Sequence, residues 1–160
     1  MAKIRIIMGS ISDLETVNEA IRVLKEFKVD FAVKILSAHR TPKELARYIE
    51  EASRAGTKVF IAAAGGAAAL AGVVAAHTTL PVIGIPMETQ SLKGLDSLLS
   101  TVQMPAGIPV ACMAIGKAGA KNAALFALAI LAAFDKKIEK KLAAYKKSMR
   151  IKVLAAKIKL

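Results

Sequence analysis

The sequence predicts an α/β fold in which a central parallel sheet is covered by helices on both faces. Five apolar runs have the length of strands and lack the polar/apolar alternation of half-exposed strands, which is typical of strands buried on both faces. Segments with helical features separate these runs. With 160 residues, 55% of them hydrophobic, the chain is long enough for one domain with a sizeable core.

The elements alternate along the chain. The predicted strands are 3–8 (KIRIIM), 30–36 (DFAVKIL), 57–64 (TKVFIAAA), 81–87 (PVIGIPM) and 108–115 (IPVACMAI). The predicted helices are 12–27, a helix that starts at 41–44, 65–77, 92–102, 119–134, and a last one from 135 to about 156. In the first helix, apolar residues stand at helical spacing: Leu14, Val17, Ala20, Ile21, Leu24 and Phe27.

Local signals support three of these helices. Thr41 can cap the second helix, Pro42 suits its first position, and Glu44 can close a capping box. The segment 65–77 is rich in small residues and is entered through two glycines. The segment 119–134 predicts a long buried helix.

The net charge of +12 lies mostly at the C-terminal end. Residues 135–160 hold 10 Lys/Arg and 2 Asp/Glu, whereas residues 1–134 hold 14 and 10. We therefore expect an α/β domain over 1–134 and a basic helix over 135–160 that packs on the domain or on a neighbouring subunit. The chain has no Trp, and Tyr145 is the only aromatic residue of the basic segment, so stacking platforms for nucleic acid are missing. A solvated lysine-rich helix face explains the charge better than nucleic-acid binding, which stays a minor alternative.

The sequence gives no sign of export or of a membrane span. Its first residues enter a strand pattern directly, without a long apolar h-region or a cleavage site. The apolar stretches are interrupted by Pro, Gly or Lys, so none predicts a transmembrane helix. The lone Cys112 excludes a disulfide framework or a Cys-based metal site within one chain. We expect a cytoplasmic protein.

Ligands of open parallel sheets bind beyond the carboxyl ends of the strands. The loops at that edge are therefore predicted to carry the chemistry, and they are GSISD, SAHRTP, GGAAALAG, METQSLKG and GKAGAKN. They hold most of the glycine, serine and small polar residues of the chain.

The loop 8–13 (MGSISD) joins a strand to a helix. Gly9 allows a tight turn, Ser10 and Ser12 offer hydroxyls, and the free N–H groups of a helix start favour an anion such as phosphate. Asp13 can cap the helix or bind sugar hydroxyls. The pattern is neither a Walker A loop nor G-x-G-x-x-G, so it does not indicate a nucleotide cofactor. An ordinary capped turn explains the loop equally well.

The loop SAHRTP (37–42) combines two chemically useful side chains. Arg40 can hold phosphate or carboxylate with two parallel hydrogen bonds. His39 has a reference pKa of about 6.5, which suits proton transfer at neutral pH. A loop histidine bonded to backbone is the alternative. Position at the ligand edge makes the two interpretations about even.

Three further segments could contact a ligand, but each also has another explanation. Gly65 and Gly66 allow a ligand to approach the main chain, although tight strand–helix packing also explains them. Core packing does not explain the polar side chains of Asp96 and Gln103. Polar residues before the buried helix are open to either interpretation, and they are Lys117, Lys121 and Asn122.

These motifs, in this order, resemble the PurE family of purine biosynthesis, the class I N5-carboxyaminoimidazole ribonucleotide mutases. The matching blocks run from about residue 4 to 133, and they are MGSISD, SAHRTP, AGGAA, LPVIGIP, LKGLDSLLSTVQMPAGIPVACMAIGKAGAKNAAL and ILA. The resemblance implies a flavodoxin-like three-layer α/β/α sandwich. It also implies a homo-octamer whose active sites form where subunits meet.

The resemblance further implies an isomerase that moves a carboxylate of its ribonucleotide substrate from N5 to C4, without metal, nucleotide or biotin. CO2 is lost and recaptured in a closed pocket, and His39 would be the catalytic proton shuttle. Ser10 and Arg40 would hold the phosphate and Asp13 the ribose hydroxyls. Matching positions add further substrate-binding residues, which are Ser37, Gly65, Gly66 and Ala69.

One block departs from the family. Members read GGAAHLPG where this chain reads GGAAALAG, so Ala69 stands at the position of a second pocket histidine and Ala71 at that of a proline. His77 is not expected to substitute, because it lies roughly 12 Å further along a helix and leads to the opposite end of the sheet. Three interpretations remain: an enzyme that works with His39 alone, a catalytically weakened relative, or an engineered scaffold with a structural or assembly role. A carboxylase that uses CO2 directly is a close variant of the first.

Overall fold

A computed structural model describes residues 2–158, and the chain divides into two compact units, Met1–Ala127 and Leu128–Leu160. The first unit is built on a parallel sheet in the order β2-β1-β3-β4-β5. Its strands are β1 (Ile4–Met8), β2 (Phe31–Ile35), β3 (Val59–Ala64), β4 (Val82–Pro86) and β5 (Ala111–Cys112). This is the flavodoxin-like strand order, so the predicted fold class is confirmed.

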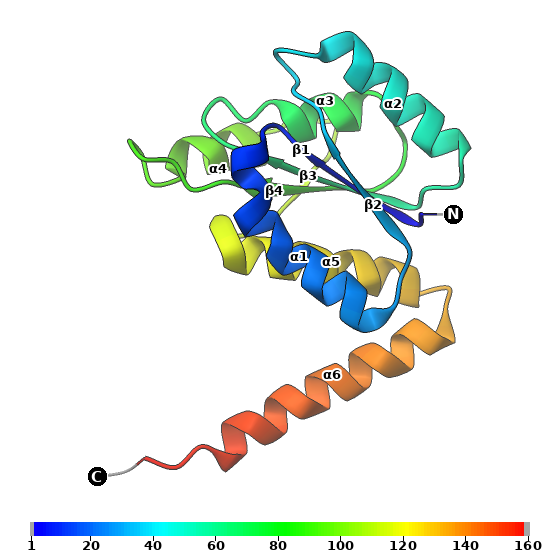
Figure 1. The fold of residues 1–160 in the computed structure, drawn as a ribbon, viewed down its shortest axis with the longest axis vertical. Coiled ribbons are helices and arrows are strands. Elements are labelled where there is room, and N and C mark those ends of the chain that lie inside the picture. The colour runs from blue at the N-terminus through cyan, green and yellow to red at the C-terminus, as the bar shows by residue number, and fades with distance from the viewer. Residues whose placement is uncertain (1, 159–160) are drawn as a thin grey trace. The chain divides into compact units, whose positions relative to one another are not determined.

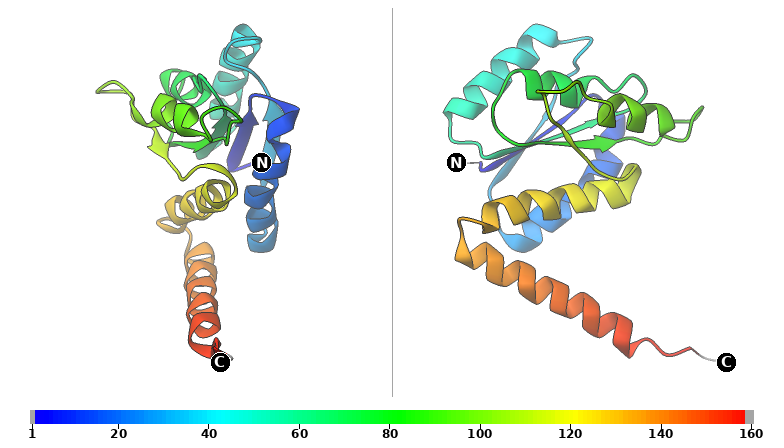
Figure 2. Two further views of the ribbon diagram at one scale, coloured as in Figure 1. Left: turned by 90° about the vertical axis from the view of Figure 1, so that its left-hand side faces the viewer. Right: turned by 180° about the vertical axis from the view of Figure 1, so that it is seen from behind.

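Helices cover both faces of the sheet (Figures 1 and 2). One face carries α2 (Pro42–Arg54), α3 (Leu70–Ala76) and α4 (Leu95–Val102). The other carries α1 (Leu14–Phe27), which a short 3-10 turn η1 (Ile11–Asp13) precedes, and the first residues, 116–127, of α5 (Gly116–Ala132). The strands therefore form the middle layer of three, as the apolar runs predict.

The core follows from strands that are apolar on both faces. In β1, Ile6 and Ile7 point to opposite faces, and both are fully buried. Ile6 stands beside Val33 of β2 and Ile61 of β3 in register. Each fully buried aliphatic side chain contributes roughly 1.5–3 kcal/mol to folding, so burial on both faces makes β1 a main part of the core.

The boundaries of several elements differ from the prediction. The helix predicted over 65–77 begins only at Leu70, because Gly66 has φ +69° and two tight turns follow it, with Ala68 N bonded to Gly66 O and Ala69 N bonded to Ala67 O, both at 2.7 Å. That backbone is incompatible with a helix. The five residues 65–69 are therefore a loop rather than the first turn of α3.

The strand predicted over 108–115 covers only Ala111–Cys112. It is an edge strand that pairs only with β4, and Pro109 has no N–H to donate to a ladder. The helix predicted from 119 begins at Gly116, so the polar residues predicted for its preceding loop lie on α5 itself, and they are Lys117, Lys121 and Asn122.

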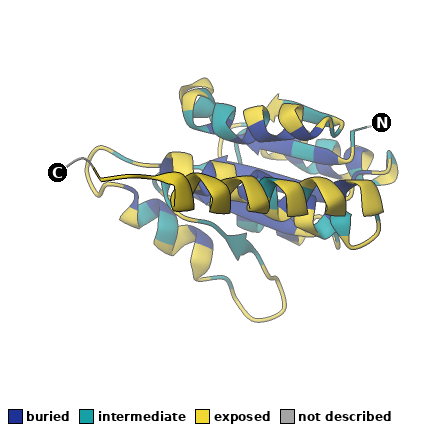
Figure 3. Ribbon diagram, turned by 90° about the horizontal axis from the view of Figure 1, so that it is seen from below, coloured by how far each residue is buried: buried dark blue, intermediate teal, exposed yellow. Residues whose placement is uncertain are grey.

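The second unit holds the end of α5 and the helix α6 (Lys136–Ala155). Asp135 caps α6, because its Oδ1 accepts from Lys137 N at 3.0 Å and from Ile138 N at 3.4 Å. Most of α6 is exposed, as the burial colours of Figure 3 show. The boundary at 134/135 and the docking of α6 on the domain or a neighbour stay predictions. No helix among the described residues is long and apolar enough to cross a membrane.

Candidate functional site

A cleft of 460 Å³ opens at the carboxyl ends of four neighbouring strands. Its walls come from the loops after β1, β2, β3 and β4. The lining residues are 9, 10, 12, 13, 37–40, 64, 65, 67–70 and 87–89. The chain leaves β1 for β2 on one side and later returns to β3 on the other, so the loops after β1 and β3 diverge here. Such a switch point is where doubly wound sheets bind ligands.

The loop after β1 is held by a reciprocal pair of hydrogen bonds. The hydroxyl of Ser10 accepts from Ser12 N at 3.3 Å, and the carboxylate of Asp13 accepts from Ser10 N at 3.1 Å. Burial raises the pKa of Asp13, although the N–H of Ser10, the hydroxyl of Ser12 and the charge of Arg40 each act to lower it. The carboxylate is thus partly desolvated at the wall of the cleft, where an incoming hydroxyl donor would be favourable.

The loop after β2 is closed by Thr41, and not in the predicted way. Thr41 makes no side-chain cap, so the capping box with Glu44 is wrong. Its hydroxyl accepts from Ser37 N at 2.9 Å and lies 3.1 Å from Ser37 O, to which it donates. The bond to Ser37 competes with the local capping pattern, and it turns the loop so that His39 and Arg40 are exposed beside the cleft.

Arg40 joins the first two loops. Its Nη2 donates to the carbonyl oxygen of Gly9 at 2.9 Å, and its backbone N–H donates to Ser37 Oγ at 3.2 Å. A guanidinium has five N–H donors, so this geometry leaves donors for an anion. The charge also lies close enough to act on the carboxyl of Asp13.

The loop after β3 contributes backbone and methyl groups. A Cβ on Gly65 would lie 3.3 Å from Met87 Cβ, so glycine allows this loop to press against the loop after β4. Ala69 lines the cleft. Gly66 does not line it, because its N–H turns away and donates to Ser97 Oγ at 3.0 Å.

The loop after β4 contains site residues that the sequence did not single out. Glu88 and Thr89 line the cleft, and Thr89 Oγ1 donates to Asp96 Oδ1 at 2.8 Å and accepts from Gly94 N at 3.1 Å. Glu88 and Thr89 directly follow a buried parallel strand, and this position in the sequence could have identified them as site residues. Asp96 thus acts behind the cleft wall rather than in it.

The structure brings together most of the predicted site residues. Seven of them line the cleft, and they are Ser10, Asp13, Ser37, His39, Arg40, Gly65 and Ala69. The sequence did not decide whether Lys117 contacts a ligand. In the structure, Lys117 pairs with Glu15 at 2.6 Å on the exposed surface of α1 and α5.

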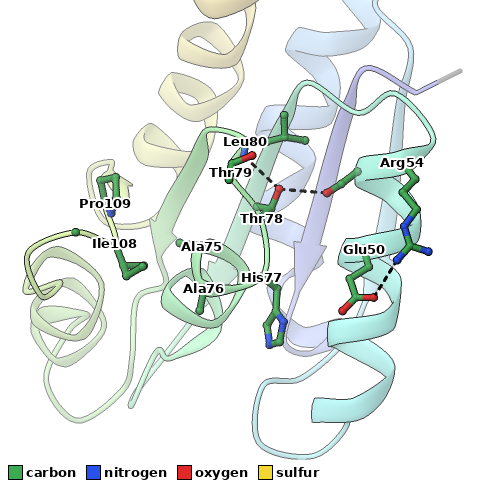
Figure 4. A pocket seen from close by; sticks show the side chains of 12 residues that line it. Glu50, Arg54, Ala75, Ala76, His77, Thr78, Thr79, Leu80, Ile108 and Pro109 are labelled. Carbon is green, nitrogen blue, oxygen red and sulfur yellow. Dashed lines mark hydrogen bonds and ion pairs between the residues drawn. The ribbon is translucent and has the colours of Figure 1, made fainter.

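The second histidine lies at the other edge of the sheet. His77 follows α3 and precedes β4, and it lines a separate cleft of 620 Å³ with Glu50 and Arg54 of α2 (Figure 4). Glu50 and Arg54 are bonded to one another at 3.5 Å. His39 is therefore the only imidazole that lines the cleft at the carboxyl edge of the described sheet, as the sequence predicts.

Comparisons with known proteins identify a family. A family model described as AIR carboxylase matches residues 3–152. The N5-carboxyaminoimidazole ribonucleotide mutase of Saccharolobus solfataricus is 49% identical over 99% of both chains. The Bacillus subtilis protein of the same name is 56% identical over 86% of this chain and 85% of its own.

A solved structure extends the likeness to the fold. The crystal structure of Treponema denticola PurE superposes with a TM-score of 0.87 and 32% identity, and the match covers 94% of this chain and 93% of that chain. Because the family model matches nearly the whole chain and relatives are about half identical along it, the chain belongs to the AIR carboxylase (PurE) family.

Proposed function

We propose that the chain is an N5-carboxyaminoimidazole ribonucleotide mutase of de novo purine biosynthesis. The observation that carries the proposal is the cleft in which Arg40 joins the loop of Ser10 and Asp13 to the loop of His39. Relatives that are about half identical over most of the chain carry this name. We further propose a cytoplasmic homo-octamer whose active sites are completed at subunit contacts.

Substrate binding follows from the groups around the cleft. Arg40 and the hydroxyl of Ser10 hold the phosphate, since a guanidinium fork and a helix start both favour that anion. The carboxylate of Asp13 accepts from the ribose hydroxyls. Ser37 supports Arg40, and the loop around Gly65 and Ala69 offers peptide groups to the ligand.

The reaction needs proton transfer and a place that retains CO2. The bond between N5 and the carboxylate carbon breaks, its electron pair returns to N5, and N5 takes up a proton. C4 then forms a bond to the carbon of CO2, and the proton on C4 leaves to restore the aromatic ring. His39 takes the C4 proton and supplies one for N5, so the imidazole ends the cycle in its starting protonation state.

The test is conversion of N5-carboxyaminoimidazole ribonucleotide to its C4-carboxylated isomer by the purified protein. His39→Asn is expected to lower kcat by about 10²–10⁴-fold, the range of general acid–base catalysis, with the fold kept. His77→Asn is the matched control, because that imidazole lies at the opposite edge of the sheet. Absence of conversion by the unmutated protein would contradict the mutase. A requirement for bicarbonate instead of the N5-carboxylated substrate would identify a direct carboxylase.

Ala69 favours a second candidate, a weakened or engineered scaffold that keeps an assembly role. We propose that Ala69 replaces a second pocket histidine and that His39 suffices without it. If it does not, Ala69→His raises a background rate by more than tenfold, whereas Ala143→His, on the exposed surface of α6, leaves it unchanged. A comparable rate before and after Ala69→His supports the mutase that works with one imidazole.

A further inference from the structure

Gly66, just past the end of β3, is bonded to α4 through both of its peptide groups. Its N–H donates to Ser97 Oγ at 3.0 Å. Its carbonyl oxygen lies 3.3 Å from Ser100 Oγ, whose one proton is shared with the carbonyl oxygen of Asp96 at 2.8 Å, so the bond from Ser97 is the stronger anchor. Its φ of +69° suits glycine alone among common residues at no cost. The next residues, 67–69, line the cleft, so the place of that wall depends on where Gly66 is held.

Ser97 is an unusual residue for its position. Its side chain is 0% exposed, and the other buried polar residues of the described chain are Thr57 and Thr101. Burying a hydroxyl is costly unless it is hydrogen-bonded, so an alanine would serve packing alone better. The partner of Ser97 lies 31 residues upstream in a loop, not in its own helix. The hydroxyl thus stabilises the loop.

Thr101 shows what a buried hydroxyl on α4 does when it serves only the helix. It is 2% exposed and donates at 2.7 Å to the carbonyl oxygen of Ser97, one turn back. No hydrogen bond from Thr101 reaches residues 64–70. Ser97 and Thr101 lie on the same helix and are almost equally buried, and they differ in whether their hydroxyl is hydrogen-bonded to the cleft loop.

The part of the cleft wall formed by residues 67–69 has no polar side chain. Ala67, Ala68 and Ala69 carry only methyl groups, so any polar contact from this wall to a ligand comes from peptide N–H and C=O groups. A peptide group cannot be re-aimed by a side-chain rotation. Its direction is set by the backbone, and hence by the anchors of that backbone.

We infer that Ser97 is a positioning residue of the site: through the N–H of Gly66 it fixes the loop 65–69 and aims the peptide N–H of Ala67 at the bound ribonucleotide. The N–H groups of Ala68 and Ala69 are already bonded within the loop and help to keep its shape. Ser97 touches no ligand itself. The identity of the ligand and of the reaction rests on the proposed function. The hydrogen bond between Ser97 and Gly66 does not depend on it.

The test compares Ser97→Ala with Thr101→Val, which removes the other buried hydroxyl of α4 at nearly constant shape. Both variants lose one buried hydrogen bond and should lose similar stability. Ser97→Ala is expected to lower kcat/KM about tenfold, because small displacements of positioning groups cost rate, while Thr101→Val stays within twofold. By NMR, hydrogen exchange of the Gly66 amide should be about tenfold faster in Ser97→Ala only.

Equal losses of kcat/KM in both variants, or a loss within twofold in Ser97→Ala, would overturn the positioning role. If the unmutated protein proves inactive, the proposed function fails separately. The anchor is then judged by the Gly66 amide and by calorimetric affinity for the ribonucleotide product. Faster exchange with about tenfold weaker binding in Ser97→Ala alone supports it, and unchanged exchange or unchanged binding overturns it.

Discussion

The guanidinium of Arg40 donates from Nη2 to the carbonyl oxygen of Gly9 across 2.9 Å, so a side chain after β2 is fixed to the backbone after β1. The backbone N–H of Arg40 is held in turn by Ser37 Oγ at 3.2 Å. Through these bonds, the loop of Ser10 and the loop of His39 are kept in one arrangement at the mouth of the cleft.

Arg40→Lys is therefore expected to weaken binding of the ribonucleotide product by at least about tenfold. An ammonium group is a point charge, and it cannot hold Gly9 O and a phosphate with one planar fork. Calorimetric titration measures the change. The control is Arg22→Lys, which alters an exposed arginine of α1 that pairs with Glu19 at 2.7 Å and does not line the cleft. Affinity within twofold in both variants would contradict the assigned role of Arg40.

Asp13→Asn is expected to raise the thermal stability of the fold at neutral pH. Burial raises the pKa of this carboxyl, so the folded state holds its proton more tightly than the unfolded state, and ionisation destabilises the fold. The amide keeps an acceptor for the N–H of Ser10 without the charge. The variant's thermal midpoint is thus expected to exceed that of the unmutated protein above the raised pKa. The difference should vanish as pH falls to the ordinary value of 3.8. A difference that grows towards acid would contradict this sign.

Glu15→Gln is expected to change stability with the opposite sign. The ion pair with Lys117 at 2.6 Å lowers the pKa of Glu15, so this group stabilises the fold above its ordinary pKa, and that contribution is lost as pH falls through the lowered value. The variant should be slightly less stable at pH 7 and equal at low pH. Because the pair is exposed, the effect is small and should shrink in high salt. Thermal melts at two salt concentrations measure it.

The parts of the site that the sequence predicted are those that follow from topology. Ser10, Asp13 and His39 each stand just after an apolar run, and the carboxyl ends of parallel strands share one edge of a sheet. No knowledge of side-chain contacts is needed to bring them together. The same argument places His77 at the opposite edge, because it precedes a strand instead of following one.

What sequence reasoning missed depends on contacts between distant segments. Thr41 matched the local pattern of a capping box, but its hydroxyl bonds Ser37 on the preceding turn. Gly66 matched a ligand-binding glycine, but its N–H is taken by Ser97. Nothing in the sequence around a serine on an amphipathic helix indicates a partner 31 residues away. Such bonds are decided by tertiary packing, which overrides local propensity.

Thr41→Val tests the closure of the loop that carries His39 and Arg40. Valine keeps the shape but removes the hydroxyl that bonds both N and O of Ser37, so the free energy of unfolding should fall by about 1–2 kcal/mol. The N–H of Ser37 then loses its partner, and the loop should exchange its amides faster. Thr41→Ser keeps the hydroxyl and should change stability by less than about 0.5 kcal/mol. Denaturant melts of the pair measure the difference, and equal losses would show that the hydroxyl does not close the loop.

Gly119→Ala is expected to be among the most damaging single methyl additions in the chain. A Cβ on this α5 residue would overlap the carbonyl oxygen of Ala114, a backbone atom that cannot move away as a side chain does. The expected loss is about 3 kcal/mol or more, at the upper end of overpacking effects.

Gly72→Ala is the matched control, because it also adds a methyl to a helical glycine. There the new atom would meet only the flexible end of Met104, with Sδ at 3.1 Å, and alanine's better helix propensity of about 1 kcal/mol offsets the contact. Thermal melts should separate the two variants by many degrees. Similar midpoints would mean that the start of α5 can shift away from Ala114, and that the close approach of backbone to backbone is not what requires glycine at this position.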